Sequence, residues 1–265
     1  MPKATVLAAC IIFISVEAAA NATDSFYVNP GSPAAQWVKQ NSESPLSTKI
    51  QTSIASVPSA QWLTGTSQAT DKLTDIISQY VGAADKAHKP PILVAYNLPG
   101  RDCSGGASAG GAANAVEYRD WIDRFINGIG DKPALVILEP DALADSECLT
   151  LPKRDERLEL FNYAVSGFKQ RAPLAEVYLD AGNSGWKPTA TMAGYLNAAG
   201  VRNARGFALN VSNFYNLDQF RSYGDAINAK LSADYGYAKA MVIDTSRYGN
   251  GATPGDWCNP PGLNT

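Results

Sequence analysis

Two aspartates, Asp102 and Asp141, are the residues best suited to chemistry, because each comes shortly after a run of Ile, Leu and Val that is typical of a buried strand. Each is also followed by a cysteine, Cys103 or Cys148, that could tie the two loops together. The chain has a single histidine. Acid–base chemistry would therefore fall to carboxyl groups, and a pair of them at strand ends is suited to cleaving a glycosidic bond.

Each aspartate has a simpler interpretation. Asp141 could cap a helical turn beginning at Ala142. As a general acid it would instead need a pKa well above about 3.9, the value of a free aspartate. Burial and a nearby negative charge both raise such a pKa, and Asp102 could supply the charge if the loops converge. Asp102 could equally form a surface ion pair with Arg101, which would contribute little.

The remaining polar candidates are ambiguous when taken singly. Tyr96 could be core packing with its hydroxyl at a strand end, and Ser108 could be a turn residue in a loop rich in Gly, Ala and Ser. His88 lies at a predicted helix end and is expected to be solvated. One histidine excludes a histidine-rich zinc site, and a Ser-His-Asp triad unless His88 moves into the site. The cysteine spacing fits no zinc motif, so we expect no metal or organic cofactor.

The five tryptophans divide by context. Trp121 lies on the apolar face of a predicted helix and is expected in the core, as is Trp37. Trp62, Trp186 and Trp257 follow strands or lie in loops beside small or polar residues. They could stack on the flat faces of sugar rings, or they could be hydrophobic plugs at the bases of loops.

Composition limits the class of protein. The chain has 265 residues, of which 45% are hydrophobic and 18% charged, and a net charge of −3 with a pI near 5.2. This suits one globular domain, and the lack of a basic run argues against nucleic acid and anionic membranes as partners.

The first 22 residues are interpreted as a signal peptide. Lys3 precedes an apolar stretch over residues 6–16 and a small-residue cleavage site. A buried N-terminal helix is the alternative. We expect a secreted protein in which a Cys103–Cys148 disulfide closes a loop of about 45 residues, worth ~4 kcal/mol, and leaves Cys258 without a partner.

From residue 26 onward short apolar strands alternate with amphipathic helices, which predicts a parallel α/β sheet. The expected strands are 26–28, 61–63, 92–96, 135–138, 177–179, 207–209 and 241–243, and the expected helices lie near 71–86, 116–129, 155–171, 189–199 and 218–235. A polar residue follows one strand after another: Asn97, Glu139, Asp180, Asn210 and Asp244. This favours an α/β barrel over a doubly wound sheet, which would more often carry a glycine-rich phosphate loop.

Seven segments together resemble glycoside hydrolase family 6, the cellulases comprising endoglucanases and cellobiohydrolases. They occur in the family's order at residues 26–30, 96–103, 139–141, 179–186, 210–214, 243–247 and 255–259. The resemblance implies a distorted α/β barrel, incomplete in its final strands, that hydrolyses β-1,4-glucosidic bonds with inversion.

The resemblance also assigns roles by motif position. Asp141 is similar to the general acid, and Asp102 to the residue that raises its pKa and helps order water. Tyr96 matches a tyrosine that crowds the sugar at the cleavage point, and Ser108 a serine that holds the attacking water. The implied substrate-binding residues are Trp62, Asp180, Asn183, Trp186, Asn210 and Trp257.

Two departures from the family pattern affect these expectations. Asn183 stands where the family usually has histidine, which could alter a sugar contact. The chain ends at Thr265, before the family's last segment with its lysine, glutamate and putative base aspartate. We therefore expect residues 23–265 to form a catalytic domain that is truncated at its C-terminus, with the partner of Cys258 in the missing part.

The expected function is hydrolysis of cellulose or a soluble β-1,4-glucan by a monomer. The loop after Asp102 is short, which favours an open cleft and endo action over a cellobiohydrolase. One alternative is a non-catalytic cello-oligosaccharide-binding protein that keeps the tryptophans but lacks the base. Another is a truncated chain that does not fold stably, because lost strands would expose sheet edges.

Overall fold

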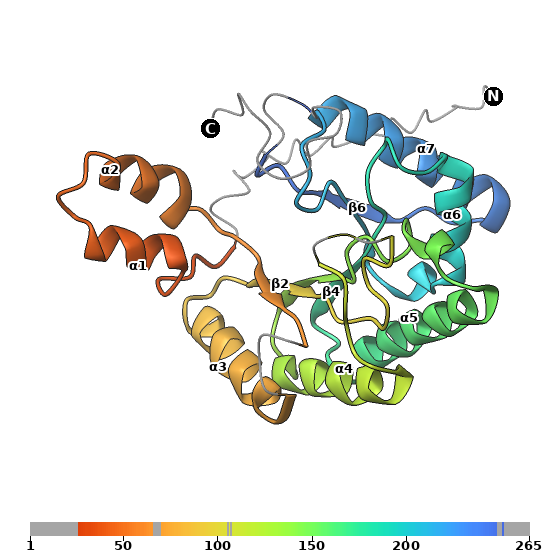
Figure 1. Cartoon of the computed structure of the whole chain (residues 1–265), viewed down its shortest axis with the longest axis horizontal. Helices are drawn as coiled ribbons and strands as arrows, with labels where there is room; N and C mark the ends of the chain where they lie inside the picture. Colours follow the sequence, from red (N-terminus) through yellow and green to blue (C-terminus); the bar gives the residue numbers. More distant parts are fainter. Residues whose placement is uncertain (1–25, 66–69, 105, 107, 248–250, 252–265) are drawn as a thin grey trace, which may run out of the picture.

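The structure is a computed structural model that describes residues 26–65, 70–104, 106, 108–247 and 251. The predicted signal peptide, Trp257 and Cys258 lie outside these residues. In the described part the chain alternates strands and helices, as the periodicity predicts, and forms one parallel sheet (Figure 1).

The sheet has six strands in the order β1-β2-β3-β4-β5-β6, and every neighbouring pair is parallel. Their bounds are β1 Gln61–Leu63, β2 Ile92–Ala95, β3 Ala134–Leu138, β4 Ala175–Asp180, β5 Gly206–Leu209 and β6 Ala240–Ile243. Six of the seven predicted strands are thus confirmed to within two residues. A parallel sheet in strict chain order needs crossovers of one hand, so its helices must cover the same face.

The predicted strand at 26–28 is wrong. The Tyr27 amide donates to the Pro90 carbonyl at 3.0 Å, but residues 26–28 are not part of the sheet. Pro90 and Pro91 have no N–H to donate in return, so a regular ladder cannot form there.

The five predicted helices form along the outside of the sheet (Figure 1). They are α3 Leu73–Lys86, α4 Ala115–Ile129, α5 Leu151–Arg171, α6 Thr189–Ala198 and α7 Leu217–Tyr235. Two further helices, α1 Pro33–Gln40 and α2 Ser47–Ile50, stand to one side of the sheet, and a π-helical turn, Gln51–Ala55, follows α2. None of the helices in the described part of the chain combines the length and the apolar composition of a membrane span.

The core has two layers because strand side chains alternate between the faces of the sheet. The larger layer lies between the sheet and the helices and contains Trp121, which confirms its predicted burial. Trp37 is only half-buried, because α1 packs mainly on the neighbouring turns and has no buried residue, so its predicted core position is wrong. The smaller layer lies on the other face of the sheet and includes Val94, Tyr96 and Ile137.

Candidate active site

The carboxyl ends of β2, β3 and β4 bring the predicted acidic residues to one edge of the sheet. Asp102 is in the loop after β2, Asp141 follows β3, and Asp180 is the last residue of β4. The predicted Cys103–Cys148 disulfide is present, with 5.9 Å between the two Cα atoms. It joins the loop that carries Asp102 to the loop that carries Asp141, as the sequence predicts.

Asp141 has the electrostatic environment expected of a proton donor. Burial, then the charge of Asp102, then that of Asp145 raise the pKa of Asp141 from 3.8 to about 7. An ordinary aspartate would be ionised at neutral pH, whereas this carboxyl group remains substantially protonated. The second cause of the raised pKa, the charge of Asp102, is the one expected from the sequence.

Asp180 lies beneath Asp141 and is itself fully buried. One of its carboxylate oxygens accepts a bond from the Asp141 amide at 3.4 Å, and both accept from the Gly182 amide. Burial, and then the neighbouring charge of Asp141, raise the pKa of Asp180 well above its usual value. Like charges this close are not readily ionised together, so an ionised Asp141 favours the protonated form of Asp180.

Asp102 does not form the surface ion pair considered from the sequence. Arg101 is buried and turns away, donating to the Tyr96 carbonyl at 2.7 Å and to the Ser108 carbonyl at 2.8 Å. Its guanidinium also lies over the Tyr96 ring, 4.7 Å from the centroid. Asp102 instead accepts a bond from the Ser108 amide at 2.8 Å, which holds the exposed Ser108 close to it.

Asp141 does not cap a helix either. The next α-helix, α5, begins at Leu151 and has Thr150 at its N-cap. The backbone of Asp141 is left-handed, with φ 68°, and so are those of Asp102 at 52° and Glu139 at 53°. Such conformations are unfavourable for residues other than glycine and tend to be kept at functional sites. Three of them after two neighbouring strands are therefore consistent with a functional site here.

Glu139 is a residue of this edge that the sequence did not assign to the site. It is fully buried and accepts bonds from the amides of Asn97 at 2.8 Å and Leu98 at 2.9 Å, which links the end of β3 to the chain leaving β2. Burial raises the pKa of Glu139 to about 7, although these two amide bonds act to lower it. The sequence signal that could have assigned Glu139 to the site is its position directly after a strand and shortly before Asp141.

Tyr96 lies among these acidic groups. Burial raises the pKa of its hydroxyl, and the charges of Asp141 and Asp102 raise it further. Its ring meets the Trp62 indole edge-on, with 5.5 Å between the centroids. Trp62 is half-buried and packs against the smaller core layer, next to the acidic edge.

The other predicted substrate-binding residues differ in exposure. Trp186 is 41% exposed and offers an indole surface in the loop after β4. Asn183 is fully buried, and its side-chain oxygen accepts from the Gly185 amide at 2.9 Å. Asn210 is also buried and donates to the Asp244 carbonyl at 2.7 Å, which joins the ends of β5 and β6. His88 is exposed beyond the C-terminal end of α3, before β2 begins.

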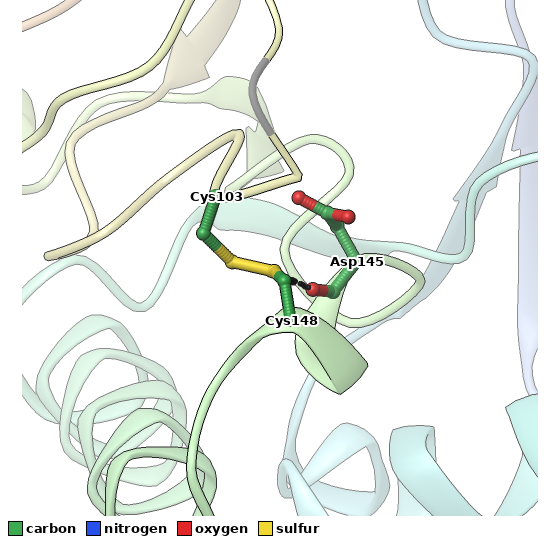
Figure 2. Close-up of side chains that lie close together, drawn as sticks. All are labelled: Cys103, Asp145 and Cys148. Atoms are coloured by element: carbon green, nitrogen blue, oxygen red, sulfur yellow. Dashed lines mark hydrogen bonds between the residues drawn. A yellow bond between two sulfur atoms is a disulfide. The ribbon is translucent and has the colours of Figure 1, made fainter.

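Cys103, Cys148 and Asp145 lie close together and superficially resemble a metal-binding cluster (Figure 2). The two sulfur atoms are bonded to each other, so neither is the thiolate that a metal requires. The Asp145 carboxylate accepts a bond from the Ser104 amide at 3.3 Å. The cluster therefore fastens the two loops together.

Comparison with known proteins shows to which family the chain is related. The family model "Glycosyl hydrolases family 6" matches residues 21–264. Endoglucanase 1 of Streptomyces halstedii is 47% identical over 240 residues, which are 91% of this chain and 74% of that protein. Endoglucanase A of Thermobispora bispora is 41% identical over 97% of this chain, which spans 56% of its length.

The fold agrees. The structure of the endoglucanase Cel6 from Mycobacterium tuberculosis superposes with a TM-score of 0.82 at 40% identity, covering 89% of this chain and 78% of that one. The six-stranded parallel sheet is thus the distorted α/β barrel of this family. The range that the family model matches includes all the acidic residues described above. The chain belongs to the glycosyl hydrolases of family 6.

Proposed function

We propose that the chain hydrolyses β-1,4-glucosidic bonds of cellulose with inversion, acting within chains. The single observation that carries this proposal is the partly buried carboxyl group of Asp141, whose pKa is raised to about 7 with Asp102 as its main charged neighbour. A carboxylic acid that stays protonated near neutral pH can protonate the oxygen of a leaving sugar.

In this mechanism Asp141 donates its proton to the glycosidic oxygen as the bond breaks. Water attacks the anomeric carbon from the opposite face, which inverts the configuration, and its released proton passes to the surrounding water, from which Asp141 is protonated again. The Ser108 amide donates a hydrogen bond to the Asp102 carboxylate beside the acid, and we assign both residues to ordering that water. Tyr96 and Trp62 form the adjoining wall, where they would favour distortion of the sugar.

Support for the substrate comes from the relatives. Those named endoglucanases are 47% and 41% identical, and the Mycobacterium tuberculosis endoglucanase was solved in complex with methyl-cellobiosyl-4-deoxy-4-thio-β-D-cellobioside. Trp186, with its exposed indole, is proposed to stack on a glucose ring. The disulfide favours an oxidising, extracellular location, as expected of an enzyme with an insoluble polymeric substrate.

The test combines chain scission with stereochemistry. We expect the purified chain to lower the viscosity of hydroxyethyl cellulose faster than reducing ends accumulate, and to release α-anomers from cellopentaose as followed by NMR. Asp141→Asn should abolish turnover and retain oligosaccharide binding. Binding without hydrolysis by the unsubstituted chain would make it a binding protein instead, and release of cellobiose from chain ends alone would refute endo action.

A further inference from the structure

Arg157 is a buried cation that the proposed mechanism does not use. It projects from α5 and is only 3% exposed, although α5 lies on the outer face of the sheet. Burying a guanidinium is costly unless its charge is compensated. Among the salt bridges of the described residues, none involves Arg157, so its direct partners are the acceptors of its hydrogen bonds.

Those hydrogen bonds reach both loops of the candidate site. Nη1 donates to the carbonyl of Ala142, the residue directly after Asp141, at 2.7 Å. Nη2 donates to the carbonyl of Gly100, two residues before Asp102, at 2.8 Å. Nη2 also lies 3.5 Å from the Pro99 carbonyl and 3.8 Å from the sulfur of Cys103.

We propose that Arg157 is a positioning residue that clamps the Asp102 loop to the Asp141 loop and thereby fixes the relative placement of the two carboxyl groups. The proposal rests on the proposed function and deepens it. The disulfide already joins these loops at one point. Together with the bond from the Ser104 amide to Asp145, it holds the chain that follows Asp102. The Arg157 bonds to Ala142 and Gly100 hold the chain that precedes Asp102, so the loop is fixed on both sides of this residue.

The chemistry of arginine explains why this residue type stands there. Its guanidinium is planar and rigid, and it carries five donors in a fixed fork, so one side chain can bond two separate carbonyl groups at a set spacing. A lysine ammonium keeps the charge but is a single point on a flexible stem. Burial lowers the pKa of Arg157, while the nearby Asp145 and Glu139 act in the opposite direction and favour the cation.

The neighbouring Arg154 provides a matched control on the same helix. It donates to the carbonyls of Leu149 at 3.0 Å and Glu147 at 2.7 Å, and both acceptors belong to the single loop between β3 and α5. It therefore makes bonds of the same kind without bridging two loops. Replacing it tests the loss of an arginine from α5 without the loss of the clamp.

The experiment compares Arg157→Lys, Arg157→Gln and Arg154→Lys with the unsubstituted chain, each below its own melting temperature. Hydrolysis of cellopentaose gives kcat, KM and the pH profile. The titration of Asp141 is followed separately by NMR of protein with ¹³C-labelled aspartate carboxyl groups, without substrate. This second measurement does not depend on activity.

We expect both Arg157 variants to lower kcat about tenfold or more, because small misplacements of catalytic groups are costly, with KM changed less than about twofold. The Asp141 titration should move toward lower pH by about half a unit, since Asp102 would no longer be held beside it. Arg154→Lys should leave all of these values unchanged.

The proposal is overturned if the Arg157 variants keep the kcat and Asp141 titration of the unsubstituted chain and lose only thermal stability, or if neither folds, because Arg157 would then be a structural residue. A chain that hydrolyses nothing would refute the proposed function. The Asp141 titration would still decide the role of Arg157 in that case.

Discussion

Replacing Asp102 with asparagine should move the pH dependence of hydrolysis in a defined direction. The general acid must be protonated, so activity falls as the pH rises through the pKa of Asp141, which is about 7. The charge of Asp102 is the second cause of that raised value, after burial. Asp102→Asn removes the charge and leaves the burial, so the alkaline limb of the profile should move to lower pH.

The magnitude follows from the interaction of like charges. A neighbouring carboxylate in a partly buried site changes a pKa by about one unit or more, so the limb should move from near pH 7 to about pH 6 or below. At pH 8 the remaining activity, relative to that at pH 5, should therefore fall about tenfold. Any loss that is equal at all pH values would instead report the proposed role of Asp102 in ordering water.

The assay is kcat/KM for cellopentaose, which is uncharged, so that the profile reports groups of the free enzyme. Asp145→Asn is the control, because Asp145 is the weaker of the two charged neighbours and should shift the limb less. If Asp102→Asn loses activity but keeps the limb where it was, the electrostatic coupling between the two aspartates is refuted.

Three further changes have expected outcomes. Asp141→Asn should stabilise the fold at pH 8 by up to about 4 kcal/mol and have little effect at pH 4. The pKa of Asp141 is raised to about 7 in the folded protein, so ionisation of this carboxyl group destabilises the fold as the pH rises from about 4 to 7. Urea unfolding at both pH values measures the change, and an equal effect at both would contradict it. Trp186→Ala should weaken cellopentaose binding about tenfold by calorimetry, whereas Trp37→Ala should not. Trp121→Ala, at a residue only 1% exposed, should lower the free energy of unfolding by about 3–5 kcal/mol; a change below about 1 kcal/mol would refute its core role.

The barrel could be predicted because its local signals agree with its tertiary structure. Each buried strand is a short run of apolar residues, and each is followed by a polar residue that reaches the same edge. The convergence of Asp102 and Asp141 followed from parallel strands and from the two cysteines, and the disulfide between Cys103 and Cys148 confirms it. No local pattern contradicted this arrangement.

The parts that were missed depend on loop conformation or on contacts between distant segments. The sequence gives no sign that Arg101 turns inward to the Tyr96 carbonyl rather than pairing with Asp102, because that choice depends on the loop conformation. The bonds of Arg157 span 57 residues to Gly100. Helix α1, in contrast, did have a signal, since Ser32 caps it and Pro33 begins it.

The most direct test of the account is the titration of the Asp141 carboxyl group in the free protein. NMR of ¹³C-labelled aspartate, assigned by its absence in Asp141→Asn, should give a pKa near 7, which falls in Asp102→Asn. A value near 4, unaffected by the charge at Asp102, would mean that Asp141 is ionised at neutral pH and cannot be the proton donor on which the proposed function depends.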